Sequence, residues 1–182
     1  MATTKWALDP THSEIGFKIK HLMISNVSGK FTKFDVYAET EDEDFSKGVV
    51  SATIDVASIN TNNADRDAHL RNADFFEAEN YPDIIFKSEK VEVVDDESFD
   101  LFGNLTIKDI TRPVRFKVEH SGVTKDPWGN TRAGFTVSGK INRKDWGITY
   151  NAALETGGVV LGDELKVEAE IQLIKQVEVV AE

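Results

Sequence analysis

Segments in which apolar and polar residues alternate recur along most of this 182-residue chain. The clearest runs from Leu165 to Leu173, where every second residue is apolar and the residues between are polar. Successive side chains of a strand point to opposite faces, so such a segment has one buried and one solvated face. The same alternation surrounds Phe17, Phe34, Ala52, Phe86, Leu105, Phe116 and Phe135. It predicts an all-β fold in which antiparallel strands close into a barrel with room inside.

Three polar stretches separate the predicted strands and read as hairpin loops: residues 39–44, 95–98 and 126–130. All three contain Asp, and the last also contains Pro, Gly and Asn; these residues favour tight turns. The acidic stretch 39–44 is interpreted as a solvated loop tip, with a metal site as the minor alternative.

Composition narrows the function classes. The formal net charge of -11 disfavours nucleic acid as a partner, because phosphates would be repelled. Cysteine is absent, which excludes disulfides and thiolate nucleophiles. No stretch reaches the roughly 20 apolar residues of a spanning helix, and the N-terminus lacks the apolar core of a signal peptide. We expect one domain over residues 1–182, no transmembrane segment and a cytoplasmic location.

Residues 60–81 break the strand pattern and predict a short helix over residues 64–72. An asparagine at position 62 or 63 is a suitable N-cap, and acidic residues occupy the first turn. Side chains four residues apart are predicted to pair, His69 with Asp65 and Arg71 with Asp67. A second helical turn from Asp74 is expected to end at Pro82. It would turn Phe75 and Phe76 inward, to gate one mouth of the barrel or simply to seal the core.

Several motifs occur together and in one order along the chain. They are Trp6-x-Leu8-Asp9-Pro10-x-His12-Ser13, Arg66-Asp67-x-His69-Leu70-x-x-x-Asp74-Phe75-Phe76, Tyr81-Pro82-x-Ile84-x-Phe86, Gly103-x-Leu105-Thr106-Ile107-Lys108 and Asn142-Arg143-x-x-Trp146-Gly147. From Trp6 to about Ile174 the chain resembles the YceI-like, polyisoprenoid-binding family. The resemblance implies an extended, lipocalin-like barrel of eight antiparallel strands, capped at one end by a short helical segment. Its tunnel would hold an isoprenoid, such as a prenyl quinone or prenyl phosphate, or a similar amphiphile, and the family leaves a homodimer open.

Two departures from the family pattern bear on this expectation. Asp109 stands where glycine is common, which is expected to alter a hairpin turn. Trp146 stands where phenylalanine or tyrosine is usual, which is expected to change the width of the tunnel.

The predicted ligand-binding residues follow from the inward faces of the strands. Gly103, Gly139, Ala52 and Ala169 fall on those faces, so space is expected beside the phenylalanines. The apolar wall is predicted to contain Phe17, Phe34, Phe75, Phe76, Phe86, Leu105, Phe116, Phe135 and Trp146. Polar contacts to a head group are assigned to His21, Arg66 and His69, from a wider set that includes His12, Asp67 and Arg143. A dry, fully packed core is the alternative.

Two rival classes remain beside lipid binding. A lipid-modifying or hydrolytic enzyme could draw on Ser13, His12, His69 and Asp67. However, the chain lacks a Gly-x-Ser-x-Gly elbow and metal-binding histidine spacings. We therefore expect no catalytic residues, no metal and no cofactor. A structural or interaction barrel without a ligand is the third class, and it should expose an apolar patch.

Overall fold

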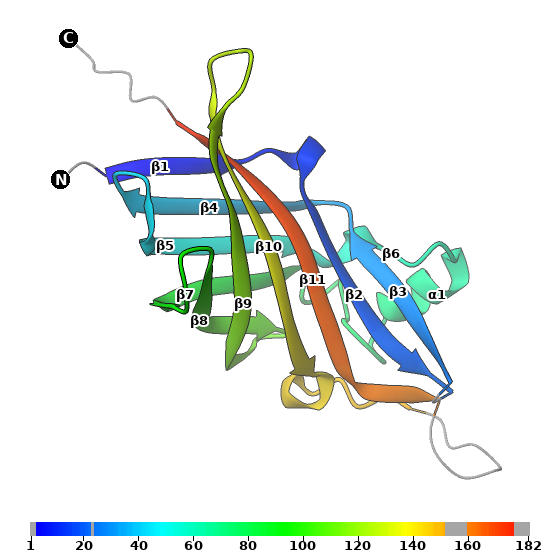
Figure 1. Ribbon diagram of the computed structural model, residues 1–182. Coiled ribbons are helices and arrows are strands. Elements are labelled where there is room, and N and C mark those ends of the chain that lie inside the picture. Colours follow the sequence, from blue (N-terminus) through cyan, green and yellow to red (C-terminus); the bar gives the residue numbers. More distant parts are fainter. Residues whose placement is uncertain (1–2, 23, 152–159, 177–182) are drawn as a thin grey trace.

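The computed structural model describes residues 3–22, 24–151 and 160–176, most of which form strands (Figure 1). The strands are β1 (Thr3–Leu8), β2 (Glu14–His21), β3 (Ser25–Phe31), β4 (Phe34–Glu41), β5 (Asp44–Asp55), β6 (Ile59–Asn60), β7 (Asp83–Val93), β8 (Ser98–Ile107), β9 (Ile110–Lys125), β10 (Thr131–Asn142) and β11 (Leu161–Lys175). The one α-helix among the described residues is α1 (Ala64–Leu70). None of the helices described has the length and apolar character to span a bilayer.

Eight antiparallel strands close the barrel, in the order β1-β4-β5-β7-β8-β9-β10-β11, with β11 returning to β1. The predicted fold class is therefore confirmed. The eight predicted strands match the eight of the closed barrel in all but one member, because they include β2 and lack β1. The predicted set also lacks β3 and β6, which extend the sheet from β2. Alternation of apolar and polar residues does not predict β1, because the polar residue Thr4 lies on its buried face together with Trp6. Trp6 is fully buried, and its indole Nε1 donates to Thr40 Oγ1 at 2.9 Å.

Strands β1 and β2 pair with successive parts of β11. Residues of β1 oppose the C-terminal end of β11, with Leu8 against Leu173, whereas β2 opposes the remainder, from Glu14 against Glu170 to His21 against Leu161. A short 3₁₀ turn at Pro10–His12 makes the corner between them. From β2 the sheet continues through β3 to β6, so the barrel wall is extended on this side (Figure 1).

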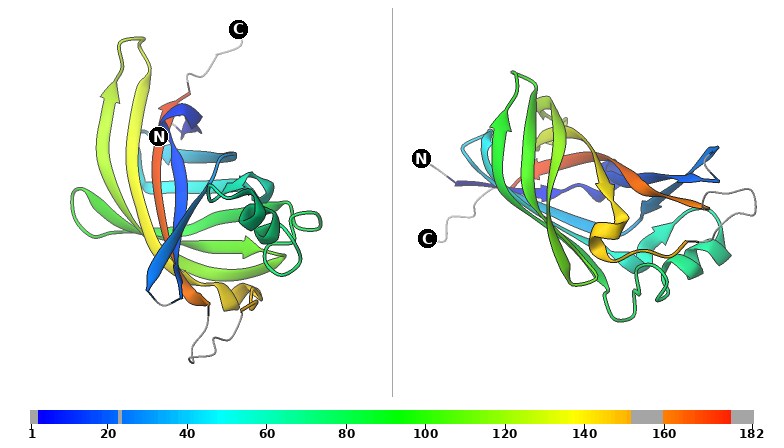
Figure 2. Two further views of the ribbon diagram at one scale, coloured as in Figure 1. Left: turned by 90° about the vertical axis from the view of Figure 1, so that its right-hand side faces the viewer. Right: turned by 90° about the horizontal axis from the view of Figure 1, so that it is seen from below.

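Helix α1 and the turns after it lie to one side of the strands, near β3 and β6 (Figure 2). Asn63 is the N-cap, since its side chain accepts from the N–H of Arg66. The helix ends at Leu70, two residues earlier than predicted, and residues 71–76 form turns instead of the predicted second helical turn. The backbone N–H of Phe76 reaches back to the carbonyl of Leu70 at 3.0 Å, which folds this segment against the end of the helix.

The β8–β9 hairpin contains one of the two family departures. Ile107 pairs with Ile110, so Lys108 and Asp109 alone form the loop. Both have positive φ, 53° and 59°. Two-residue hairpin loops of this kind require the left-handed conformation at both positions. Asp109 thus adopts the backbone conformation that glycine would favour.

Candidate functional site

An apolar cavity of about 210 Å³ lies inside the barrel. Its wall consists of inward-facing side chains from β2 to β5 and β7 to β11, together with Phe76 and residues 143–148. Arg143 is the one charged residue among the described residues of this wall. The cavity therefore suits a hydrocarbon far better than a polar solute.

Seven of the twelve predicted ligand-binding residues line the cavity, namely Phe17, Phe76, Phe86, Leu105, Phe116, Phe135 and Trp146. The other five lie elsewhere in the described structure. Phe34 packs against the core from β4, and His21 ends β2 opposite Leu161 and Ser25. Phe75, Arg66 and His69 belong to α1 and the turns that follow it. The structure thus brings seven of the predicted residues together at the cavity and leaves the other five outside its described wall.

The inward glycines do not leave the free space that their positions predict. A Cβ at Gly103 would lie 2.6 Å from Cζ of Phe86, and a Cβ at Gly139 would lie 2.5 Å from Cδ1 of Phe116. The phenyl rings thus occupy the room that these glycines leave. The two predicted alanines differ, because Ala52 and Ala169 do line the cavity.

Three phenylalanines form a cluster on one side of the cavity. The ring centroids of Phe17 and Phe31 are 5.7 Å apart, and those of Phe31 and Phe76 are 6.1 Å apart. All three line the cavity, but Phe17 and Phe76 are only partly buried. Phe76 therefore lines the cavity while it is partly exposed, an arrangement that fits both the predicted gate and the predicted alternative, a seal of the core.

The polar residues of α1 make contacts other than those predicted. Asp67 accepts from the N–H and hydroxyl of Thr61 at 2.9 and 2.5 Å, and Arg66 donates to the same hydroxyl at 2.8 Å. His69 pairs with Asp74 at 2.9 Å instead of Asp65. The predicted pairs at four-residue spacing are wrong because the chain folds back at both ends of this short helix. These contacts hold the helix and its flanking turns together.

Phe75 lies outside the cavity wall, in an aromatic group with His69 and Tyr150. The three ring centroids are 4.9 to 5.2 Å apart. Tyr150 belongs to the segment after the 3₁₀ turn Arg143–Trp146. This group joins the turns after α1 to the end of β10.

Arg143 is 3% exposed and holds in place the segment that follows the 3₁₀ turn and contains Ile148 and Tyr150. Its Nε donates to the carbonyl of Gly162 at 2.9 Å, and its Nη1 donates to the carbonyls of Ile148 and Tyr150 at 2.9 and 2.8 Å. Nη2 makes no hydrogen bond within the described residues and lies 3.8 Å from Oδ1 of Asp163. Burial lowers the pKa of Arg143 from its ordinary value, and the charge of Asp163 partly opposes that shift. The guanidinium remains protonated at neutral pH.

His120 also has a buried, unpartnered atom, its Nε2. The imidazole stacks on Phe135 with centroids 4.7 Å apart and meets the edge of Phe45. Burial lowers the pKa of His120, although a hydrogen bond to the backbone of Gly122 acts in the opposite direction. The ring thus packs among aromatic side chains of the barrel interior.

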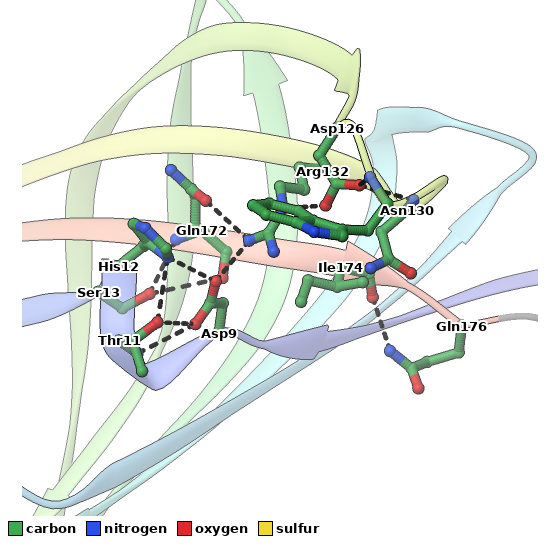
Figure 3. A network of polar contacts seen from close by, with 11 residues as sticks. Asp9, Thr11, His12, Ser13, Asp126, Asn130, Arg132, Gln172, Ile174 and Gln176 are labelled. Atoms are coloured by element: carbon green, nitrogen blue, oxygen red, sulfur yellow. Dashed lines mark hydrogen bonds and ion pairs between the residues drawn. The ribbon is translucent and has the colours of Figure 1, made fainter.

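A second polar group lies on the barrel wall, around the corner between β1 and β2 (Figure 3). Arg132 of β10 binds Asp9 and Gln172, and its Nε donates to Asp126 at 2.7 Å. Burial alone would raise the pKa of Asp9, but hydrogen bonds from Arg132, Thr11 and His12 outweigh it and hold that pKa well below its usual range. Arg132 likewise lowers the pKa of Asp126. This network ties the corner to β10, β11 and the β9–β10 hairpin.

The residues considered for hydrolysis are engaged separately. His12 Nδ1 pairs with Asp9 at 2.7 Å, and Ser13 Oγ accepts from the N–H of Gln172 at 2.9 Å. His69 and Asp67 bind Asp74 and Thr61 as described above. Within the described ranges, no three His, Asp or Glu side chains gather as a metal site would require.

Known proteins resemble the chain over nearly its whole length. A family model described as YceI-like domain matches residues 6–173. UPF0312 protein SA2479 of Staphylococcus aureus (strain N315) is 45% identical over 167 residues, covering 91% of this chain and 95% of the relative. The crystal structure of the Campylobacter jejuni YCEI protein superposes with a TM-score of 0.74 at 34% identity, covering 93% of this chain and 97% of that one.

A more distant structure shares the fold. The polyisoprenoid binding domain from Saccharophagus degradans superposes with a TM-score of 0.66, covering 94% of this chain and 98% of that domain. Its sequence identity to the chain is 14%, so this likeness establishes the architecture alone.

Proposed function

Because the chain belongs to the YceI-like family, we propose that its barrel binds one long apolar chain, shields it from water and releases it chemically unchanged. The observation that carries this proposal is the internal cavity, whose described wall is apolar except for Arg143. An apolar ligand that fills a cavity lined by such side chains gains dispersion contacts with its wall. Storage or transfer of a lipid is therefore the function that this interior supports best.

We propose an isoprenoid or a similar amphiphile as the cargo. The Saccharophagus degradans domain of the same fold is described as polyisoprenoid binding, which supports this class. Burial of hydrocarbon contributes roughly 0.8 kcal/mol per methylene. A chain of many carbons thus has enough driving force to offset the cost of ordering it.

The ligand-bound barrel would be wider than the barrel described here. The cavity volume of about 210 Å³ is below the roughly 300–1,000 Å³ of ordinary ligand pockets. Phe17 and Phe76 line the cavity while only partly buried, so their displacement would both enlarge it and open it. We propose that the ligand enters between β2, β3 and the turns after α1.

The contacts of the polar residues support binding without catalysis. Ser13, His12, His69 and Asp67 each hold a neighbouring turn or strand, as structural residues do. A functional group at the end of a buried lipid would face apolar side chains over most of the described wall. No cofactor is part of this proposal.

The test is to extract the protein, purified from its native host, with organic solvent and to identify bound lipids by mass spectrometry. A prenyl lipid recovered in near-stoichiometric amount, and taken up again intact by the stripped protein, is expected. A product of altered mass after incubation would favour a lipid-modifying enzyme instead. If extraction yields no lipid and added isoprenoid is not taken up, the proposal fails.

A further inference from the structure

The β2–β3 hairpin differs in charge from the rest of this acidic chain. Residues 16–31 contain three lysines and no aspartate or glutamate, although 32 of the 182 residues of the chain are acidic. Side chains directly opposite each other on paired strands share a face of the sheet. The register of β2 with β3 therefore puts Lys18, Lys20 and Lys30 on the same, exposed face. The hairpin thus presents a basic face to solvent.

Two more lysines continue this basic face onto the barrel. Lys166 of β11 lies directly opposite Lys18 on one side and Lys140 of β10 on the other, an arrangement of like charges that destabilises a sheet. Glu168 pairs with Lys18 at 3.9 Å and Glu164 with Lys140 at 3.8 Å, but these side chains are exposed and such pairs contribute little. Lys166 makes no ion pair within the described residues. We call the five lysines the lysine surface: Lys18, Lys20, Lys30, Lys140 and Lys166.

The tip of the same hairpin is apolar and exposed. Ile24 is 86% exposed and Leu22 is 38% exposed. Hydrogen bonds hold the backbone of this tip, from the N–H of Leu22 to the carbonyl of Val160 at 2.7 Å and from the N–H of Ile24 to that of His21 at 3.3 Å. An isoleucine held in water in this way gains free energy when an apolar phase covers it. Leu22 and Ile24 form what we call the apolar tip, which lies at the end of the basic hairpin.

The hairpin also borders the proposed entrance to the cavity. Phe17 precedes Lys18 on β2, so the two side chains point to opposite faces of the strand, and Phe17 lines the cavity. In Figure 1, β2 and β3 run past α1 to the apolar tip at the lower right. A surface in contact with the apolar tip and the lysine surface would therefore have the entrance beside it.

We propose that the lysine surface and the apolar tip dock the protein on an anionic lipid bilayer, from which the barrel takes up its apolar chain or to which it delivers it. Lysines attract anionic head groups, and exposed apolar side chains insert at the boundary between head groups and acyl chains. A long apolar chain partitions into bilayers, which favours a bilayer over an acidic protein as the partner. The inference rests on the proposed function and adds the donor or acceptor of the lipid.

The charge of the whole chain gives this docking an orientation. The formal net charge is -11 despite the lysine surface, so the rest of the chain is strongly acidic and is repelled by anionic lipid. Attachment through the β2–β3 side would thus turn the entrance toward the bilayer. Contacts this few bind weakly and reversibly, as repeated transfer of a lipid requires.

The test is co-sedimentation of the wild-type protein with vesicles of phosphatidylcholine, with and without phosphatidylglycerol. Binding is expected on the vesicles that contain phosphatidylglycerol and should fall as salt is added, because salt screens exposed charges. Lys18→Gln combined with Lys166→Gln should weaken this binding roughly tenfold or more. The matched control is Lys47→Gln combined with Lys87→Gln, which removes two exposed lysines from β5 and β7.

A second pair of variants tests the apolar tip. Ile24→Ser should weaken binding to the anionic vesicles several-fold. Val94→Ser is its control, because Val94 is also exposed, at 60%, but lies in the loop between β7 and β8. Both variants should take up an isoprenoid from cyclodextrin as the wild type does, whereas Ile24→Ser should take it up more slowly from anionic vesicles.

The outcomes separate docking from lipid binding. Equal binding to both kinds of vesicle, binding to neither, or equal losses in the lysine variant and its control would overturn the docking surface. Binding to immobilised polyglutamate without binding to anionic vesicles would indicate an acidic protein and overturn the bilayer as partner. Salt-sensitive vesicle binding without any uptake of isoprenoid from cyclodextrin would instead overturn the proposed function and leave only the contact with the bilayer.

Discussion

The ring of Phe116 on β9 occupies the space above Gly139 on β10. A Cβ at Gly139 would lie 2.5 Å from Cδ1 and 3.1 Å from Cε1 of that ring. Phe116 also lines the cavity and meets Phe86 with ring centroids 5.6 Å apart. The absence of a side chain at position 139 therefore determines where one wall of the cavity lies.

Gly139→Ala is predicted to destabilise the protein and to push Phe116 toward the cavity. Overpacking of this kind costs about 1–3 kcal/mol, measurable by urea unfolding, and uptake of a long-chain lipid should fall as well. Gly134→Ala on the same strand is the control, because its Cβ would meet its nearest neighbour, Ser121 Cβ, at an ordinary 3.6 Å. Equal costs for the two substitutions would show that Phe116 is not held against Gly139.

Asp109→Gly is predicted to stabilise the β8–β9 hairpin. Asp109 has a φ of 59°, a conformation that glycine adopts without steric cost. The expected gain is up to about 1 kcal/mol, since relief of backbone strain exceeds the added entropy of the unfolded chain. Asp96→Gly, in the exposed loop between β7 and β8, is the control and should not raise the melting temperature of the protein. A melting temperature that falls for Asp109→Gly would contradict this account of the turn.

The Asp9–Arg132–Asp126 network is predicted to make stability fall in acid. The folded protein holds the pKa values of Asp9 and Asp126 below those of the unfolded chain. Their contribution to stability is therefore complete above the unfolded pKa and is lost as pH falls toward the folded values. The free energy of unfolding should decline from about pH 5 downward, as measured by urea titration at each pH.

Arg132→Leu should flatten that acid dependence, because Arg132 is a principal cause of both low pKa values. Arg112→Leu is the matched control, since exposed Arg112 has only a backbone carbonyl, that of Thr111, as its hydrogen-bond acceptor in the described structure. An unchanged pH profile in Arg132→Leu would mean that other carboxylates dominate the acid response.

The strands that the sequence predicts correctly are those whose inward face is uniformly apolar. In β11, Val167, Ala169 and Ile171 line the cavity while the residues between them face outward. β3 is not among the predicted strands because its residues 25–28 are polar except Val27. Its Gly29 leaves room for the ring of Phe17 on the next strand. Such a requirement belongs to the pair of strands and cannot be found from one segment.

Part of the cavity wall could also be predicted from the sequence, because alternation within single segments places residues on the inward face. Five of its predicted phenylalanines follow from alternation or from the aromatic pair before Pro82. Arg143 was only one of several polar candidates, because its burial depends on carbonyls supplied by Ile148, Tyr150 and Gly162 after the chain folds. The Asp9–Arg132 contact joins residues 123 positions apart, and no local pattern indicates it.

Phe76→Ala is predicted to accelerate exchange of a bound lipid. The partly buried ring of Phe76 packs on Phe31 at the proposed entrance, so its removal opens a path to the cavity. The measurement is the rate of transfer of a fluorescent lipid from the protein to acceptor vesicles. Phe102→Ala is the control, because this partly buried phenylalanine lies under Lys90 and is not part of the described cavity wall. Equal rates in both variants would place the entrance elsewhere.

The most direct test of the account is to fill the cavity from within. Ala169 lines it from β11, whereas the adjacent Glu170 is exposed. Ala169→Phe and Glu170→Phe are compared for uptake of a long-chain isoprenoid, quantified by mass spectrometry after circular dichroism shows both to be folded. Ala169→Phe is expected to lose most of its bound lipid, while Glu170→Phe is expected to retain the wild-type amount. Full retention by folded Ala169→Phe would contradict the claim that the apolar chain lies in this cavity.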